Sequence, residues 1–311
     1  MRHSLSCLSC TLAAILIGIL ATRYVHVLSY FSPFYSAQTH VALFAAALAV
    51  VSLLIRRNLA AIALVLIALA MAAHLPVRLY PLGALASDSQ SAGKTGLRVM
   101  SFNILGDNLE GGPEIRDEVA RSGADVAVIL EALPLQTQLK SLAETYPYRL
   151  GCGEGTTGCD LMILSRHPFS EKTVGALSEL RSERYMRVAV EIDGRKVNVV
   201  AAHLSKPYFD QYHTSELWRL WRRLDRIEGP LVLAGDFNAS SMAPDMMWFL
   251  KKTGLRRAPL EPSTWPIMLG PLGIAIDHIY ARAPMRLKSL DRIADPHGSN
   301  HYGLIADLIL D

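Results

Sequence analysis

The sequence predicts an α/β domain with mixed sheets and helices outside them, preceded by a bundle of about three transmembrane helices. Two observations predict this fold class. From about residue 97 onward, short apolar runs that are typical of strands alternate with amphipathic helical patterns. Before residue 87 the chain contains no Asp or Glu and is dominated by long apolar runs. A chain of 311 residues has room for both parts.

Three apolar runs, at 5–21, 41–55 and 59–75, predict a membrane anchor over residues 1–78. Each run has about 15–17 residues, at or just below the length that crosses a hydrocarbon layer of about 30 Å. A cleaved signal peptide is the alternative for the first run, because Arg2 precedes an apolar stretch of fitting length. Two apolar runs would still remain in the mature protein.

The positive charges of this region predict its orientation. Arg56 and Arg57 lie in the short loop between the second and third runs, and Arg2 lies at the start of the chain. Positively charged loops favour the cytoplasmic side, and Arg23 and Arg78 weaken this bias without reversing it. We therefore expect a multi-pass protein of the cytoplasmic (inner) membrane, with everything after the anchor on the periplasmic or extracytoplasmic side.

Cysteine placement is consistent with that side of the membrane. Cys152 and Cys159 bracket the glycine-rich loop 153–158, so we expect a small disulfide in an oxidising compartment. Free thiols and a metal-binding pair are the alternatives, although no second Cys or His pair stands at zinc-finger spacing. Cys7 and Cys10 lie in the first apolar run and are expected to face the membrane.

Composition also indicates how the residues after the anchor are organised. Residues 79–96 are rich in Pro, Gly and Ser, which predicts a linker between the anchor and a catalytic domain over residues 97–311. Outside the five arginines of the anchor, acidic residues outnumber basic residues by two. A dedicated duplex-DNA binder usually has a basic surface, and this domain as a whole is close to neutral.

The first elements of the domain are predicted as strand, helix and strand. Residues 97–102 form an apolar strand pattern. The helix at 113–122 begins at Pro113 and ends before Gly123, which are favoured residues for a helix start and stop. The strand at 125–130 is a continuous apolar run, and Glu131 ends it.

The middle of the domain is predicted as a helix, a strand and a hairpin. Leucines at helical spacing predict a helix at 134–145, and an apolar run predicts a strand at 160–165. Strands at 187–192 and 196–202 flank Asp193-Gly194, which is a strong hairpin signal.

The last elements end the α/β pattern. Residues 214–227 and 243–253 are amphipathic and predict helices, with a short strand at 231–234 between them. A strand that leads into Asp277 and a final strand at 303–309 complete the domain.

Polar side chains stand at or near the ends of several of these apolar runs. If the strands bring these side chains to one edge of a sheet, the group is too polar to be part of a core. It then indicates a metal-assisted hydrolytic site. These residues are Asn103, Glu131, His203, Asp236, Asn238, Asp277, Asn300 and His301.

These positions carry a family resemblance over about residues 97–310. The motifs are Ser101-Phe102-Asn103, Leu130-Glu131, Ala202-His203-Leu204, the run from Leu233 to Ala239 (LAGDFNA), Ile276-Asp277-His278-Ile279 and Ser299-Asn300-His301. In this order and spacing they resemble the endonuclease/exonuclease/phosphatase superfamily, which is deoxyribonuclease I-like. The resemblance implies a four-layer α/β/β/α sandwich of two mixed sheets. It also implies divalent-metal-dependent cleavage of a phosphoester, with water as the nucleophile.

Three positions are metal-ligand candidates for Mg²⁺ or Mn²⁺, which prefer oxygen ligands. Glu131 is the first choice, because a charge closing a buried strand is otherwise unexpected; an exposed strand-end carboxylate is the alternative. Asn103 would offer an amide oxygen or orient a neighbour, or it closes a turn. Asn300 stands where the family commonly has Asp, and the missing charge weakens any metal site that uses this position.

The resemblance also assigns the catalytic roles. Asp236 would orient or deprotonate the attacking water and Asn238 would hydrogen-bond the phosphate oxygens; on an extended backbone, side chains two apart share a face. An Asx turn without chemistry is the alternative. His301 would be the base, with Asp277 fixing its tautomer. His203 would bind the scissile phosphate or protonate the leaving group.

Other polar and aromatic residues are weaker candidates. His278 should point to the opposite face from Asp277 and stay outside catalysis. Lys206 and Tyr208 follow His203 in a loop and would bind the substrate, or simply lead into the next helix. Trp265 would line the substrate pocket or pack in the core.

The leading hypothesis is a membrane-anchored, metal-dependent phosphodiesterase or nuclease. A phosphatase or phosphodiesterase acting on phospholipids or small phosphorylated molecules is the alternative within this class. A catalytically weakened binding or scaffold domain, marked by Asn300, is an alternative of another class. The expected partners are a phosphoester substrate and the lipid bilayer, and no protein partner is predicted.

Overall fold

The computed structural model describes residues 2–91, 93–94, 96–207 and 210–311. The chain divides into two compact units. One comprises Met1–Pro81 together with Pro207–Gln211 and Ala239–Trp248, and the other comprises Leu82–Lys206, Tyr212–Asn238 and Phe249–Asp311. We describe each unit by itself.

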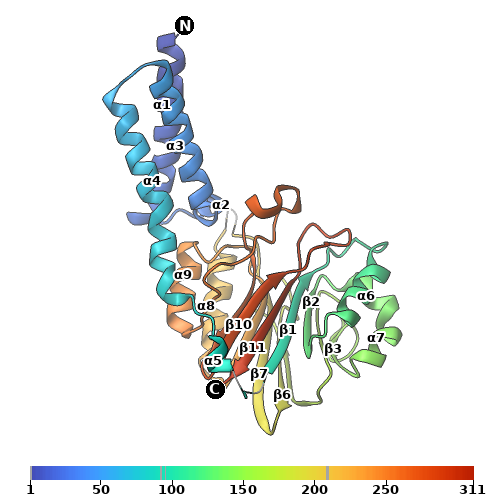
Figure 1. Ribbon diagram of the computed structural model, residues 1–311. Helices are drawn as coiled ribbons and strands as arrows, with labels where there is room; N and C mark the ends of the chain where they lie inside the picture. The colour runs from blue at the N-terminus through green and yellow to red at the C-terminus, as the bar shows by residue number, and fades with distance from the viewer. Residues whose placement is uncertain (1, 92, 95, 208–209) are drawn as a thin grey trace. The chain divides into compact units, whose positions relative to one another are not determined.

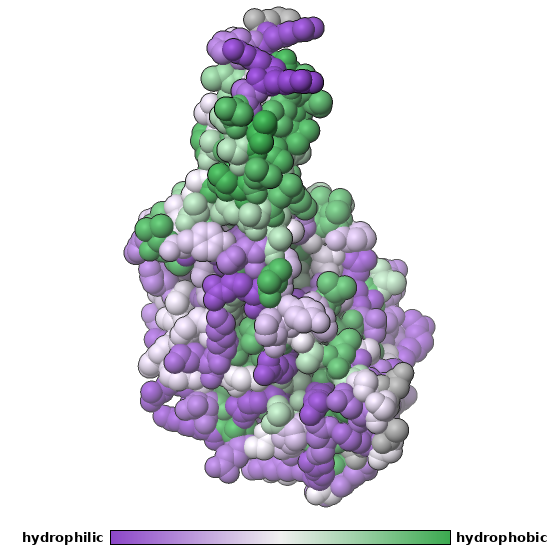
Figure 2. Space-filling model, turned by 60° about the vertical axis from the view of Figure 1, so that its left-hand side comes forward, coloured by the Kyte–Doolittle hydropathy of each residue, from purple (hydrophilic) through white to green (hydrophobic). Residues whose placement is uncertain are grey.

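Three long helices dominate the first unit: α1 (Arg2–Ala21), α3 (Gln38–Ile55) and α4 (Leu59–Leu79) (Figure 1). All three are long and apolar enough to cross a membrane, as the apolar runs predicted. Their surface is hydrophobic along most of its length and hydrophilic at one end (Figure 2). Short helices η1 (Thr22–Tyr24), η2 (Ser29–Phe31) and α2 (Ser32–Ser36) connect α1 to α3.

Small and hydroxyl-bearing residues hold α1 against α3. Ala42, Ala45 and Ala49 of α3 are fully buried, which allows close approach of the helix backbones. The Ser6 and Ser52 hydroxyls are hydrogen-bonded at 2.7 Å, and Ser9 Oγ donates to the Leu48 carbonyl at 2.6 Å. In an apolar environment such bonds satisfy groups that would otherwise be costly to bury.

Two sheets form the second unit. The first has six strands in the order β10-β11-β1-β2-β4-β3, and the second has five in the order β5-β6-β7-β8-β9. The strands are β1 (Gly96–Asn103), β2 (Val126–Leu130), β3 (Tyr148–Gly151), β4 (Leu161–Ser165), β5 (Phe169–Gly175), β6 (Tyr185–Ile192), β7 (Arg195–His203), β8 (Leu231–Asp236), β9 (Asp277–Arg282), β10 (Met285–Arg292) and β11 (Leu304–Leu310). Each sheet is mixed, with parallel β1–β2 and β7–β8 pairs among antiparallel neighbours.

The main core lies between the two sheets. One apolar cluster joins residues of the first sheet, such as Val128, to residues of the second, such as Val199. A separate cluster packs Ile115 of α6 (Gly112–Arg121) and Leu142 of α7 (Leu139–Thr145) on the other face of the first sheet. Helices α8 (Tyr212–Leu224) and α9 (Pro244–Thr253) accompany the second sheet (Figure 1). The predicted α/β/β/α sandwich is confirmed.

Several element boundaries differ from the expected ones. The helix expected at 134–145 is a 3₁₀ helix, η4 (Leu133–Gln138), followed by α7. Strands β3, β5 and β10 were not predicted; all three lie at sheet edges, and β5 is mostly exposed. Edge strands with polar residues on the solvent side lack the apolar alternation on which sequence patterns depend.

The start of the predicted linker is bound to the second unit. The Ala84 amide donates to the Arg257 carbonyl at 3.0 Å, and the Arg257 amide donates to the Leu82 carbonyl at 3.1 Å. Ala86 is buried, and its amide donates to Leu287. Along the chain, only Tyr80 and Pro81 separate the end of α4 from this hydrogen-bonded segment.

Candidate active site

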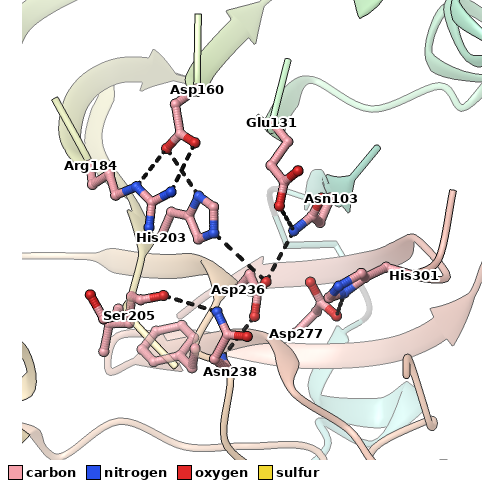
Figure 3. A network of polar contacts seen from close by, with 12 residues as sticks. Asn103, Glu131, Asp160, Arg184, His203, Ser205, Asp236, Asn238, Asp277 and His301 are labelled. Atoms are coloured by element: carbon pink, nitrogen blue, oxygen red, sulfur yellow. Dashed lines mark hydrogen bonds and ion pairs between the residues drawn. The ribbon is translucent and has the colours of Figure 1, made fainter. Parts of the chain in front are cut away.

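Four strand ends bring polar side chains to one edge of the second unit (Figure 3). Asn103 is the last residue of β1, and Glu131 directly follows its parallel neighbour β2. His203 and Asp236 are the last residues of β7 and β8, which are also parallel. Parallel strands carry their carboxyl ends to the same edge, so one polar residue per strand is enough to build a cluster.

Asp277 and His301 reach the same edge from the opposite chain direction. We expected a strand leading into Asp277, but Asp277 is the first residue of β9, which is antiparallel to β8 and pairs Asp277 with Asp236. His301 likewise precedes β11, which is antiparallel to β1. In an antiparallel strand the amino end meets the carboxyl end of its neighbour, which explains the shared edge.

Asn103 links two carboxylates at the centre of the cluster. Its Nδ2 donates to Glu131 Oε1 at 3.2 Å and to Asp236 Oδ2 at 3.0 Å, while its Oδ1 accepts from the Leu105 amide. The other Glu131 oxygen accepts from the Gly106 amide at 2.8 Å. Asn103 is buried, so in this structure it orients its neighbours.

Unusual backbone geometry aims two of these side chains. Glu131 and Asn238 have φ values of 53° and 51°, a region that costs free energy for residues other than glycine. Gly235, at φ 149°, passes so close to β7 that a Cβ would lie 1.9 Å from the Ala202 carbonyl oxygen. The Gly-Asp-Phe-Asn motif thus requires its glycine for this close approach.

We expected an extended backbone from Asp236 to Asn238, and the structure differs. Because Asn238 turns into the left-handed region, its amide donates to Asp236 Oδ1 at 2.7 Å in an Asx-type turn. Its side-chain Nδ2 donates to the Leu204 carbonyl at 2.9 Å. Asn238 therefore forms an Asx-type turn and also belongs to the polar cluster, with its amide oxygen facing the site.

His301 is paired with Asp277. His301 Nδ1 lies 2.8 Å from Asp277 Oδ2, and both side chains are buried. Burial alone would lower the pKa of His301, but the charge of Asp277, its hydrogen bond and the nearby Asp236 and Glu131 raise it to about 9. The pairing fixes Nδ1 as the nitrogen facing the carboxylate and leaves Nε2 for chemistry.

His203 has its own carboxylate partner, which the sequence did not suggest. Asp160 Oδ2 lies 3.0 Å from His203 Nδ1 and 2.9 Å from Arg184 Nε. Burial would raise the pKa of Asp160, but the hydrogen bond from His203 and the charges of His203 and Arg184 lower it to about 2. His203 Nε2 lies 3.9 Å from Asp236 Oδ2. The only sequence signal was a charge placed directly before the buried strand β4.

The donor set suits a divalent metal ion. Ligand atoms of Asp236, Asp277 and His301 lie within 4.8 Å of one another. Asp277 Oδ1 is buried without a hydrogen-bond partner in the described part of the chain. Burial and the charge of Asp277 raise the pKa of Asp236. A cation would relieve both penalties, and with Glu131 nearby the oxygen ligands match Mg²⁺ or Mn²⁺.

The remaining predicted residues are placed differently. Asn300 is exposed, and no hydrogen bond joins it to the cluster among residues 2–91, 93–94, 96–207 and 210–311. Trp265 is half-buried and its backbone pairs with Ile274. His278 is buried and lies within hydrogen-bonding distance of Glu261. Tyr208 lies outside the described residues.

A pocket of about 420 Å³ opens beside the cluster. Glu131, His203 and Asn238 of the cluster line it, together with Arg181 and Lys206. Lys206 therefore lies in the lining of the same pocket as three residues of the cluster.

Comparison with known proteins assigns the fold to a family. Residues 100–301 match the model of the Endonuclease/Exonuclease/phosphatase family. A search of curated proteins gave no match. The structural neighbours include an endonuclease/exonuclease/phosphatase family protein from Bacteroides thetaiotaomicron (18% identity, TM-score 0.57, covering 70% of this chain and 99% of that chain). They also include a conserved protein of unknown function from Enterococcus faecalis V583 (15%, 0.57, 69% and 100%) and humanized D. rerio TDP2 (18%, 0.56, 68% and 98%).

The chain belongs to the endonuclease/exonuclease/phosphatase family, because the family model covers well over half of it. Members of this family are generally hydrolases of phosphoesters and typically use divalent metal ions. The structural neighbours are below 25% identity and show the fold alone.

Proposed function

We propose that this protein is a membrane-anchored, divalent-metal-dependent phosphodiesterase or nuclease that hydrolyses a phosphodiester with an activated water. One observation carries the proposal. Two imidazole–carboxylate pairs, His301 with Asp277 and His203 with Asp160, lie on either side of Asp236. Phosphodiester hydrolysis requires a proton to leave the water and another to reach the leaving oxygen, which two such pairs provide.

Each pair has a separate task in this proposal. In its neutral form, which a cation bound to the neighbouring carboxylates would favour by offsetting the charges that raise its pKa, His301 accepts the proton of the attacking water through Nε2, while Asp277 stabilises the resulting imidazolium. His203 donates a proton to the leaving oxygen, with Asp160 and Arg184 holding its ring. Asp236 orients the water. The second N–H of Asn238 Nδ2 donates to a phosphate oxygen, and Asn103 Nδ2 holds the carboxylates of Glu131 and Asp236.

Glu131 and Asp236, with Asp277, would hold the metal ion. When bound, Mg²⁺ or Mn²⁺ supplies positive charge that neutralises the phosphate oxygens. Asn103 orients two of these carboxylates through its paired hydrogen bonds. Asn300 adds no charge here, so the carboxylates of β2, β8 and β9 carry the site.

The proposed location is the outer face of the cytoplasmic membrane. Arg2, Arg56 and Arg57 are exposed at the ends of α1 and α3, and positive charge at such ends favours the cytoplasm. Three crossings then place the second unit on the extracytoplasmic side. The Cys152–Cys159 disulfide is consistent with an oxidising compartment.

The test is hydrolysis by the full chain in detergent, with Mg²⁺, Mn²⁺ or chelator. The substrates are bis(p-nitrophenyl) phosphate, a diester, and p-nitrophenyl phosphate, a monoester. We expect metal-dependent turnover of the diester that falls at least about 100-fold in His301→Ala, the usual loss when a general base is removed. His167→Ala, a histidine outside the cluster, is the matched control.

Preference for the monoester would shift the proposal to a phosphatase. Absence of turnover on both esters would favour the binding or scaffold alternative, and Asn300→Asp then tests it. Recovery of metal-dependent turnover in Asn300→Asp would identify the lost charge as the cause. Plasmid DNA and phospholipid vesicles separate a nuclease from a lipid phosphodiesterase.

A further inference from the structure

An exposed apolar loop lies next to the candidate active site. It contains η5 (Ile267–Leu272), and the side chains of Met268, Leu269 and Leu272 are 86%, 50% and 70% exposed. Leu260, a few residues earlier, is 87% exposed. Single exposed apolar residues are common on protein surfaces, but four large ones within thirteen residues form an unusual concentration.

The loop is also free of exposed charge. Glu261 is the only charged residue between positions 258 and 276. Its side chain is only 7% exposed, because it is bound to Arg257 at 2.7 Å and to His278 at 2.8 Å. The surface that the segment offers to its surroundings is therefore apolar and neutral, which is unfavourable in water alone.

Hydrogen bonds hold the loop in its exposed position. The Trp265 amide donates to the Ile274 carbonyl at 3.0 Å, and the Ile274 amide donates back to Trp265 at 2.7 Å. Across the loop, Ser263 Oγ donates to the Gly270 carbonyl at 2.6 Å. The tip is thus presented on a closed, ordered base, so its exposure does not arise from fraying.

The base of the loop joins the catalytic cluster directly. Thr264 is fully buried, and its Oγ1 accepts from the amides of Ile276 and Asp277 at 3.1 and 3.2 Å. The amide of Tyr302, next to His301, donates to the Thr264 carbonyl at 2.9 Å. One buried threonine therefore connects the apolar tip to both members of the Asp277–His301 pair.

The length of the connection to the anchor limits what this tip can reach. Only Tyr80 and Pro81 lie between α4 and the segment hydrogen-bonded to the second unit. Two residues span at most about 7 Å, so under the proposed anchoring by α4 the second unit is tethered close to the bilayer. At this short range an apolar, uncharged tip meets lipid at a high effective concentration.

We infer that the loop tip formed by Met268, Leu269 and Leu272 inserts into the outer leaflet of the membrane. This is a second membrane contact, separate from the helices. It brings the rim of the catalytic cluster to the level of the lipid head groups, where phosphoesters held in the bilayer are reached without leaving it. Its effect on substrate choice rests on the proposed function, whereas the insertion itself does not.

The experiment places a fluorescent label on the loop of the full chain in lipid nanodiscs. Cys7→Ala and Cys10→Ala remove the free thiols, and Met268→Cys is labelled with bimane. The control is Glu228→Cys, an exposed residue just before β8 and therefore at the sheet edge opposite Asp236, about 20 Å away along the strand. Nanodiscs are prepared with and without a phospholipid that carries a doxyl quencher in its acyl chain.

The expected result is blue-shifted emission at position 268 and quenching by the doxyl lipid that exceeds the quenching at position 228. Equal quenching at both positions would overturn the inference. Blue-shifted emission that depends on protein density and is insensitive to the doxyl lipid would overturn it as well, because the tip would then contact a second copy of the chain.

A second measurement uses the triple variant Met268→Ser, Leu269→Ser and Leu272→Ser. We expect kcat/KM for a phosphoester embedded in vesicles to fall at least about tenfold, since three apolar side chains lose their contact with lipid. Turnover of a soluble diester should be retained, which shows that the variant is folded. Equal losses on both substrates would contradict insertion, while absence of any turnover in the parent chain would refute the proposed function and leave the quenching result intact.

Discussion

At the scale of single residues, each side chain with a proposed catalytic role has a neighbour that fixes it. Asp277 holds His301, Asp160 holds His203, and Asn103 holds two carboxylates. The first of these pairs was predicted from motifs. Asp160 was not, because it directly precedes a strand that carries no motif and meets His203 only after the two sheets pack together.

Asp160→Asn tests this dependence. The amide keeps the shape but removes the charge that stabilises a protonated His203, so we expect turnover at pH 7 to fall about 10- to 100-fold. Asp117→Asn, which removes a surface charge paired with Arg116, should have little effect. Equal activity of both variants would show that His203 needs no carboxylate partner.

The carboxylate of Asp160 should also stabilise the fold in a pH-dependent way. Its pKa is lowered to about 2 in the folded chain, so its contribution is present above about pH 4 and is lost as the pH falls through 2.

His301 predicts the opposite pH dependence in metal-free protein. Its pKa is raised to about 9, so its contribution to stability is full below about pH 6.5 and is lost as the pH rises through 9. The change is on the order of 3 kcal/mol. Thermal unfolding in chelator between pH 6 and 10 should show this loss in the wild type and a flatter profile in His301→Gln. A wild-type profile as flat as that of the variant would contradict the pairing.

At the scale of elements, loops tie the two sheets together around the site. Cys152 and Cys159 are joined by a disulfide, and Asp160 directly follows it. Glu183 accepts from the amides of Thr157 and Gly158 at 2.9 Å each, which fastens the disulfide loop to the segment before β6. The sequence indicated the cysteine pair from its spacing, whereas the link to Glu183 depends on how the sheets pack.

Removal of this disulfide should weaken both the fold and the site. For a loop of this length we expect the double variant Cys152→Ser, Cys159→Ser to lose about 2–3 kcal/mol of unfolding free energy. Turnover should also fall, because Asp160 loses its rigid support. The control is Cys7→Ser, which leaves the disulfide intact. A double variant with wild-type stability but reduced activity would separate the two effects.

The elements that were predicted well are those with clear sequence signals. Buried strands β2 and β8 contain continuous apolar runs, β1 is mostly apolar, and the β6–β7 hairpin has a clear Asp193-Gly194 turn. The prediction that Asp277 ends its strand was wrong, because a short apolar run contains no information on whether a neighbouring polar residue begins or ends the strand. Only pairing with β8 decides this.

At the scale of the whole molecule, the carboxylates of the site should couple metal binding to stability. Asp236, Asp277 and Glu131 belong to one cluster, where burial and the charge of Asp277 raise the pKa of Asp236. A ligand that binds only the folded chain stabilises it by about 2.7 kcal/mol at 100 times its Kd. We expect Mg²⁺ or Mn²⁺ to raise the melting temperature, and chelator to reverse the increase.

The variant Asp236→Asn provides the matching control. It should melt at the same temperature with and without metal, since one ligand and one repulsive charge are both removed. An increase in melting temperature equal to that of the wild type would place the metal elsewhere.

The two-residue connection after α4 changes how the protein would meet its substrate. A catalytic unit that cannot diffuse away from its anchor samples a thin layer over the membrane, and its encounters with membrane-bound molecules take place in two dimensions. The relevant concentration is then the number of substrate molecules per unit area, which does not change when the surrounding volume is diluted. Substrates dissolved in that volume would instead compete on their bulk concentration, so dilution at constant lipid separates the two kinds of substrate.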